Sequence, residues 1–178
     1  MAEEFNVNPE SFDQDSVMIY IDPKVMNSLN DMAEKKREDL KALREAAEDG
    51  DLDAQYRLGR SYFYGEDGAP KDGDKAFYWF QKAADGDSIA AKYYLGLCYS
   101  RGMGAEKDLV RAVELFEAAA DEGYLPAVTE LGLCYELGHG VEMDKGKAAE
   151  LYQEAADQDH APAQCNLGYF YYQGIFFE

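Results

Sequence analysis

Leu131-Gly132-Leu133-Cys134-Tyr135 is one of four copies of a Leu-Gly-x-x-Tyr phrase in this chain. The other copies begin at Leu58, Leu95 and Leu167, so the spacings between copies are 37, 36 and 36 residues. A second phrase, an Ala-Ala pair, keeps the same interval at positions 46–47, 83–84, 119–120 and 155–156. A fixed period of this length is typical of stacked copies of one supersecondary unit. Function is therefore expected on a surface built by several repeats rather than in a single catalytic cluster.

Each repeat is predicted to be a pair of helices. In the second repeat the spacing of apolar residues predicts helices over 90–101 and 108–122, with Gly102-Met103-Gly104 as the turn between them. Asp108 is the expected N-cap of the second helix. The equivalent aspartates in the neighbouring repeats are Asp72 and Asp144.

The glycine of the repeated phrase falls in the middle of a predicted helix. Glycine costs about 1 kcal/mol there relative to alanine, so its repetition predicts that a partner helix approaches too closely for a side chain. The Ala-Ala pairs of the second helices supply a complementary small surface. We therefore predict tight packing within each helix pair.

The third repeat shows the whole pattern, which resembles the Sel-1-like repeat family, close kin of tetratricopeptide repeats. Its matching residues are Ala127, Leu131-Gly132, Tyr135, Gly138-His139-Gly140-Val141, Asp144, Lys147-Ala148, Tyr152 and Ala155-Ala156. The resemblance covers about residues 40–174. It implies an all-α fold, a right-handed α-solenoid of antiparallel helix pairs. The family consists of adaptors and scaffolds with varied partners, so the resemblance implies protein binding.

Two parts of the chain are predicted: an acidic, mostly disordered tail over 1–22 and a single α-solenoid domain over 23–178. The domain is divided into an N-terminal capping helix 23–50, repeats 53–87, 90–123 and 126–159, and a partial repeat 162–174. The apolar face of the capping helix is marked by Val25, Leu29, Met32, Leu40, Leu43 and Ala47. The segment 17–21 has strand character. The fourth repeat is predicted to have a first helix without a second helix after it, so the apolar end 175–177 suggests a fragment of a longer array.

Composition excludes several classes of function. The net charge is −19, from 36 acidic and 17 basic residues, so phosphates of nucleic acids and anionic membrane surfaces would be repelled. Residues 1–23 hold six acids and no Lys or Arg, unlike a signal peptide, and the apolar stretches are too short to span a bilayer. Cys98 and Cys134 occupy equivalent places in successive repeats, too far apart for a disulfide. We therefore expect a soluble, cytoplasmic protein with reduced thiols.

A second stripe on each first helix is the predicted binding surface. It comprises the positions two before the repeated leucine and two, five and six after it, which share one arc of a helix. In tetratricopeptide-like arrays this arc lines the concave surface, which is what the resemblance implies here. The predicted partner-binding residues are Tyr56, Arg60, Phe63, Tyr64, Tyr93, Leu97, Arg101, Leu133, Leu137, Tyr169 and Tyr172.

The composition of this stripe favours a partner, because exposed aromatics and arginines are enriched in binding hot spots. Its tyrosines would supply apolar contact, and Arg60 and Arg101 would pair with carboxylates or stack on rings. Two alternatives stay open. In the first, the groove is covered by the protein itself, through segment 17–21, the long first helix or a second copy of the chain. In the second, the stripe serves ordinary superhelical packing.

No catalytic or metal-binding motif is recognised. Residues 49–53 begin like a calcium loop, but Ala54 and Arg60 stand where glycine and a bidentate glutamate are required. His139 and His160 lack partners at ligand spacing, and no histidine can be assigned as a base to Cys165. We therefore predict no cofactor, no metal and no enzymatic activity.

The predicted function is a scaffold or adaptor that binds a segment of another protein or a peptide in the concave groove, without nucleic acid or membrane partners. One alternative uses the charge: an acidic mimic of nucleic acid, or an inhibitor, that occupies a basic site of a protein. Another is a regulatory subunit of a larger enzyme assembly.

Overall fold

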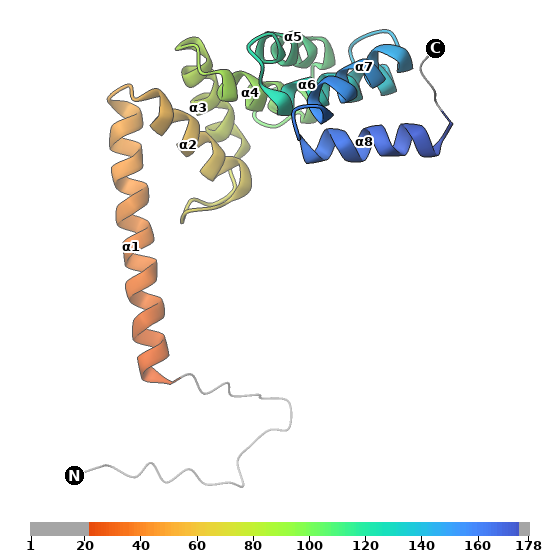
Figure 1. Cartoon of the computed structure of the whole chain (residues 1–178). Coiled ribbons are helices and arrows are strands. Elements are labelled where there is room, and N and C mark those ends of the chain that lie inside the picture. The colour runs from red at the N-terminus through yellow and green to blue at the C-terminus, as the bar shows by residue number, and fades with distance from the viewer. Residues whose placement is uncertain (1–21, 175–178) are drawn as a thin grey trace, which may run out of the picture. The chain divides into compact units, whose positions relative to one another are not determined.

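The computed structural model describes residues 22–174, which form helices joined by short turns and contain no strand. The predictions for the tail before residue 22, for segment 17–21 and for the end 175–178 lie outside the described residues. The helices are α1 (Pro23–Glu48), α2 (Leu52–Tyr64), α3 (Gly73–Asp85), α4 (Ile89–Arg101), α5 (Leu109–Ala120), α6 (Leu125–Leu137), α7 (Lys145–Ala156) and α8 (Ala161–Tyr172) (Figure 1).

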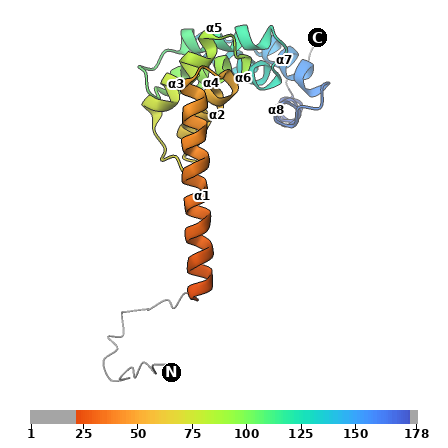
Figure 2. The ribbon, with the colours of Figure 1, turned by 90° about the vertical axis from the view of Figure 1, so that its left-hand side faces the viewer.

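The chain divides into two compact units, one ending at Lys35 and the other beginning at Lys36. In the first unit the described residues form the first half of α1, which is a single uninterrupted helix (Figure 2). Val25, Leu29 and Met32, which mark the predicted apolar face of this helix, are all exposed.

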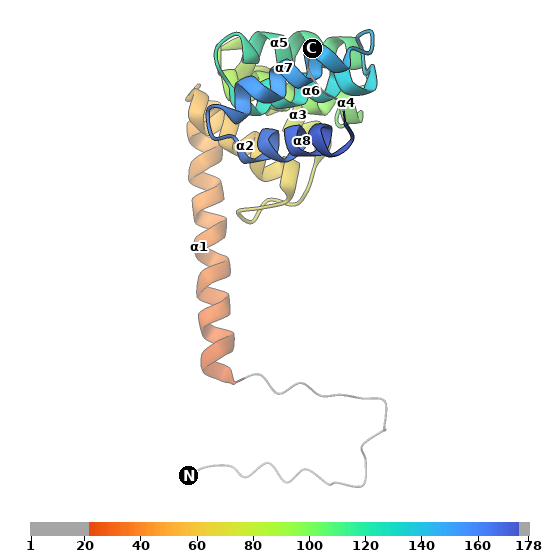
Figure 3. The same ribbon diagram turned by 45° about the vertical axis from the view of Figure 1, so that its right-hand side comes forward.

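In the second unit each helix from α2 to α8 packs against the next one along the chain (Figures 1 and 3). The aspartate before each second helix fixes the turn in two ways. Its carboxylate accepts a hydrogen bond from the backbone N–H three residues later, for example from Arg111 to Asp108 at 2.9 Å. Its own backbone N–H donates to the carbonyl of the repeated tyrosine, Asp108 to Tyr99 at 3.0 Å. Asp72 and Asp144 make both bonds too, so the predicted N-caps are confirmed.

The turns that follow the first helices depend on glycine. Gly102 and Gly138 end α4 and α6 with φ of 66° and 69°, in the left-handed region where a side chain is strained. The second helix α5 ends at Ala120, two residues before the predicted end at 122.

The glycine of the repeated phrase meets an aromatic ring of the following second helix. A Cβ at Gly59, Gly96 or Gly132 would lie 2.6–2.7 Å from a ring carbon, closer than real side chains allow. The rings belong to Phe80, Phe116 and Tyr152. The close approach predicted from the repeated glycine is therefore present in these three repeats. At Gly168 of α8 no described atom lies within 4 Å of the Cβ position.

The second half of α1 takes the place that a second helix has in later repeats. A Cβ at Gly68 would lie 3.5 Å from the carbonyl oxygen of Lys36, and Gly104 packs in the same way on Gly73 at the start of α3. From Lys36 onward α1 is therefore in register with α3. Further along the helix, the carbonyl of Ala47 accepts a 3.0 Å hydrogen bond from the side chain of Gln55.

A hollow of about 470 Å³ lies between this half of α1 and α2. Leu43 forms part of its apolar floor, and Asp53 and Arg57 line its wall. One interval of 37 residues separates Leu43 from Phe80 and Arg57 from Tyr94. The rings of Phe80 and Tyr94 pack against Phe63 of α2. That this helix caps the array stays a prediction.

Candidate functional site

The predicted binding residues of α2 and α4 come together in one aromatic cluster. The ring of Phe63 contacts those of Tyr64 and Tyr94, with centroids 4.9 and 5.6 Å apart. The ring of Tyr56 lies 5.7 Å from that of Tyr94. Tyr93 extends the cluster from α4 toward α6, because its ring contacts that of Tyr124 at 5.4 Å.

Five partly exposed tyrosines form the outer layer of this cluster, which we name the tyrosine surface. Its members are Tyr56, Tyr64, Tyr93, Tyr94 and Tyr124. Buried rings of α3 and α5 support it from below. The ring of Phe80 stacks on Tyr94 at 5.0 Å, and that of Phe116 lies 5.9 Å from Tyr93. The surface is therefore held in place by the core.

Two arginines flank the neighbouring rings of Tyr64 and Phe63, and we name them the arginine pair. The guanidinium of Arg60 lies 5.9 Å from the ring centroid of Tyr64, and that of Arg101 lies 5.5 Å from that of Phe63. A guanidinium over a ring is attracted by the negative face of the ring. Both arginines are thereby fixed at the edge of the tyrosine surface.

Two hollows adjoin the tyrosine surface. One, of about 290 Å³, is lined by Tyr93, Tyr124 and His160 among others. The other, of about 260 Å³ and named here the arginine hollow, is lined by Leu97, Arg101, Lys107, Phe116, Glu130 and Leu133 among others. Glu130 of α6 lines both hollows. Burial raises the pKa of Glu130, and the nearby positive charge of Arg101 opposes that shift.

Not every predicted binding residue is on the outside of this site. Phe63 and Leu97 are only 2% and 4% exposed, so they form the floor under the surface. Leu137, Tyr169 and Tyr172 are exposed near the ends of α6 and α8. Among the described residues no ring contact or hydrogen bond joins these three side chains to the α2–α4 cluster.

Sequence reasoning missed Tyr94, Tyr124 and Glu130. Tyr94 and Glu130 both stand directly before the repeated leucine, at a position left out of the predicted stripe. In the structure this position faces the preceding first helix. The type of residue that stands directly before the repeated leucine could therefore have indicated these contacts between repeats. Tyr124 precedes the first residue of α6, where helical periodicity does not apply.

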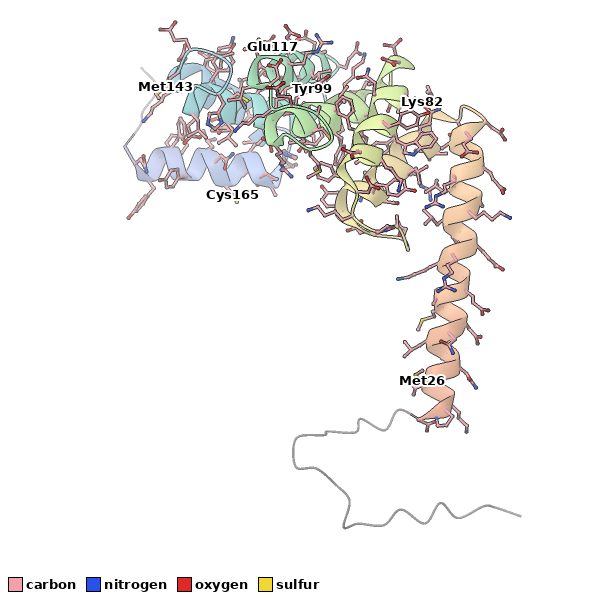
Figure 4. The ribbon with its side chains drawn as sticks, turned by 180° about the vertical axis from the view of Figure 1, so that it is seen from behind. Met26, Lys82, Tyr99, Glu117, Met143 and Cys165 are labelled. Carbon is pink, nitrogen blue, oxygen red and sulfur yellow. The ribbon has the colours of Figure 1, made fainter. Side chains whose placement is uncertain are left out.

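The titratable groups near the site favour binding over nucleophilic chemistry. Burial raises the pKa of Tyr93 and of Tyr94, so both rings stay neutral and apolar at ordinary pH. Burial also raises the pKa of Cys98 to about 12 and that of Cys134 to about 11, and such thiols are poor nucleophiles. Cys165 is exposed on α8 (Figure 4).

Within residues 22–174 no group of three His, Cys, Asp or Glu side chains is placed to hold a metal ion. None of the described helices is long and apolar enough to cross a lipid bilayer.

The family model of the Sel1 repeat matches four consecutive segments, 52–88, 89–124, 125–160 and 161–177. The chain belongs to the Sel1 repeat family. The first three Sel1 repeats correspond to the pairs α2–α3, α4–α5 and α6–α7, and the fourth begins with α8. The resemblance identified from the repeated phrase is thereby confirmed.

Solved structures of Sel1-like proteins share the fold. A Sel1 repeat protein from Oxalobacter formigenes has a TM-score of 0.71 and 32% identity, over 86% of this chain and 65% of that one. The protective antigen c5321 of uropathogenic Escherichia coli has a TM-score of 0.68 and 36% identity, over 76% of this chain and 29% of that one. Cysteine rich protein B of Helicobacter pylori, at 20% identity and a TM-score of 0.56, shows the fold alone, over 76% of this chain and 96% of that one. The all-α solenoid fold predicted from the sequence is confirmed.

One curated relative is HRD3A of Arabidopsis thaliana, described as an ERAD-associated E3 ubiquitin-protein ligase component. It is 37% identical over 67 residues, which are 38% of this chain and 10% of that protein. The chain thus matches about a tenth of the length of this relative. Sel1 repeats generally mediate protein–protein interactions and are typically non-catalytic scaffolds.

Replacing Glu130 with glutamine is expected to raise the thermal midpoint of unfolding at neutral pH. Because the folded-state pKa of Glu130 lies above its ordinary value of 4.5, ionisation costs stability as pH rises through the folded-state pKa. The cost grows as pH rises above 4.5 and vanishes well below it, where the carboxyl group is protonated in both states and the two proteins should unfold alike. Thermal unfolding at both pH values measures the difference, with the exposed Glu117→Gln (Figure 4) as control. A lower midpoint of Glu130→Gln at neutral pH would mean that the carboxylate makes a net favourable contact.

Proposed function

We propose that this protein is an interaction module that captures a segment of a partner protein on the tyrosine surface and the two hollows beside it. The observation that carries the proposal is the continuous chain of ring contacts from Tyr64 through Tyr94 and Tyr93 to Tyr124. Monomeric proteins rarely expose apolar surface of this kind without a partner. Tyrosines held by a core bind at a low cost in side-chain entropy, as hot spots require.

Affinity capture from a lysate of the source organism, followed by mass spectrometry, tests this proposal. The variant Tyr64→Ala/Tyr93→Ala removes two rings of the tyrosine surface. Its control, Tyr78→Ala/Val110→Ala, removes two exposed apolar side chains from the second helices α3 and α5. The dissociation constant of the captured partner is expected to rise roughly tenfold or more for the first variant. It is expected to stay unchanged for the control.

Retention of the partner by Tyr64→Ala/Tyr93→Ala would overturn the proposal and move the site to the acidic exterior. Partner binding that falls steeply with salt in both variants would favour the acidic mimic of nucleic acid instead. A separate Tyr172→Ala variant asks whether the binding surface extends to α8, where Tyr172 is 88% exposed.

The role of a component in a larger enzyme assembly is compatible with this proposal, because such a component also works by binding. HRD3A, described as a ligase component, supplies the observation that favours it. Recovery of an enzyme subunit among the tyrosine-dependent partners would support that role.

A further inference from the structure

The arginine pair and the arginine hollow give the tyrosine surface a positive edge in a strongly acidic protein. The chain has 36 acidic and 17 basic residues. Arg101 and Lys107 nevertheless line one hollow together, and Glu130 is its one acidic lining residue. Arg60 stands on α2 over the ring of Tyr64, which contacts the Phe63 ring under Arg101.

These cations are weakly neutralised by the protein itself. The ion pairs of the described residues include neither Arg101 nor Lys107. The ion pair of Arg60 with Glu66 is long, at 4.0 Å, and both side chains are exposed. The charge of Glu130 is disfavoured by its burial, which raises its pKa. Positive charge is therefore available to a ligand at this edge.

The geometry also indicates what these arginines bind. Each guanidinium already has one face over a ring of its own chain, so its other face and its in-plane N–H donors remain for a ligand. A guanidinium keeps N–H donors in its plane, and their fork matches the two oxygens of a carboxylate. The arginine hollow beside them has an apolar floor that includes Leu97, Phe116 and Leu133. Its volume of about 260 Å³ suits an apolar side chain.

We propose that the partner is an acidic segment, in which an apolar side chain enters the arginine hollow while neighbouring carboxylates bind Arg101 and Arg60. This inference rests on the proposed function and names the chemistry of its partner. It assigns carboxylates, one of the two kinds of partner that the sequence left open for these arginines.

The net charge of −19 does not oppose this assignment at physiological salt. The Debye length there is about 8 Å, so exposed carboxylates farther from the groove are largely screened. A carboxylate in contact with a guanidinium is screened much less. The local pair therefore outweighs the distant repulsion.

The test is a selection of phage-displayed random peptides on the full chain at physiological ionic strength, followed by affinity measurements with synthetic peptides. The variant Arg60→Gln/Arg101→Gln removes two positive charges from the groove. Its control, Arg111→Glu, changes the net charge by the same amount on α5, where Arg111 pairs with Glu114 at 2.8 Å. Tyr64→Ala/Tyr93→Ala is measured in parallel.

The selected peptides are expected to place Asp or Glu beside an apolar residue. Their dissociation constants should rise roughly tenfold to a hundredfold in Arg60→Gln/Arg101→Gln, the range for hydrogen bonds to charged groups, and little in Arg111→Glu. Peptides that need the tyrosines but neither acids nor the arginine pair would overturn this inference and leave the proposed function standing. Acidic peptides that ignore the tyrosines would count against the proposed function instead. A selection that yields no acidic peptide overturns the inference.

Discussion

Replacing Phe80 with alanine is expected to lower the free energy of unfolding by about 3–5 kcal/mol, the cost of deleting a buried phenylalanine side chain. Phe80 is 0% exposed and lies where three aromatic residues of neighbouring helices meet. Its ring centroid is 5.0 Å from that of Tyr94, 6.0 Å from that of Phe63 and 6.5 Å from that of Tyr56. The cavity left by alanine cannot collapse easily, because Gly59 opposite the ring has no side chain to fill it.

Urea unfolding followed by far-UV circular dichroism measures this loss, and thermal unfolding should show a midpoint lower by roughly 6–20 °C. The matched control is Tyr78→Ala, which removes an aromatic side chain of the same helix that is 50% exposed. The control should cost much less than Phe80→Ala. Equal losses in the two variants would contradict the view that the buried ring, rather than helix α3 in general, joins the first two repeats.

The same substitution should weaken partner binding, because Phe80 supports Tyr94 and Tyr56 from below. This link between core and surface explains why the fold was easier to predict than the site. The repeated pattern marks positions that hold the same residue type in successive repeats, such as Gly96 and Asp108. The packing role of the glycine and the capping role of the aspartate follow from general rules. The long helix α1 was predicted correctly as a helix. Val25, Leu29 and Met32 on its predicted apolar face are nevertheless exposed, because apolar spacing alone does not show where a neighbouring helix lies.

The site depends instead on positions where the repeats differ. The place before the repeated leucine holds Arg57, Tyr94 and Glu130 in the first three repeats. In the second and third repeats it faces the preceding first helix, so its chemistry depends on the neighbouring repeat as well as on the helix that carries it. The helical arc of a single repeat could place Tyr64 and Arg101 on the surface, but it could not show that Phe63 lies beneath Arg101. Contacts between repeats supplied the rest.

Replacing Gly96 or Gly132 with alanine is expected to destabilise the protein, although alanine is the better helix former. A Cβ at Gly96 would lie 2.6 Å from Cε1 of Phe116 and 3.2 Å from the carbonyl oxygen of Ala112. At Gly132 the equivalent atom would lie 2.7 Å from Cε1 of Tyr152. Overpacking of this kind costs about 1–3 kcal/mol, which matches or exceeds the gain of about 1 kcal/mol in helix propensity.

Gly168→Ala is the control for these variants, because Gly168 has the same place in its repeat and no described atom within 4 Å of its Cβ position. The propensity gain is common to all three substitutions, so Gly168→Ala should be neutral or stabilising by up to about 1 kcal/mol. The difference between Gly96→Ala and Gly168→Ala in urea unfolding then isolates the cost of the close approach. Equal effects would show that the helices separate without penalty, against the packing argued from the repeated phrase.

A double-mutant cycle identifies the ring as the cause. Phe116→Leu alone should destabilise the protein, because it leaves a cavity over Gly96. In Gly96→Ala/Phe116→Leu the new methyl group occupies part of that cavity. The loss of stability in the double variant should therefore be smaller than the sum of the losses in the two single variants, with a coupling energy of about 0.5–3 kcal/mol. Strict additivity would place the strain elsewhere, at the carbonyl of Ala112. In that case the backbone of the second helix, and not its aromatic residue, would be the reason that glycine recurs in these repeats.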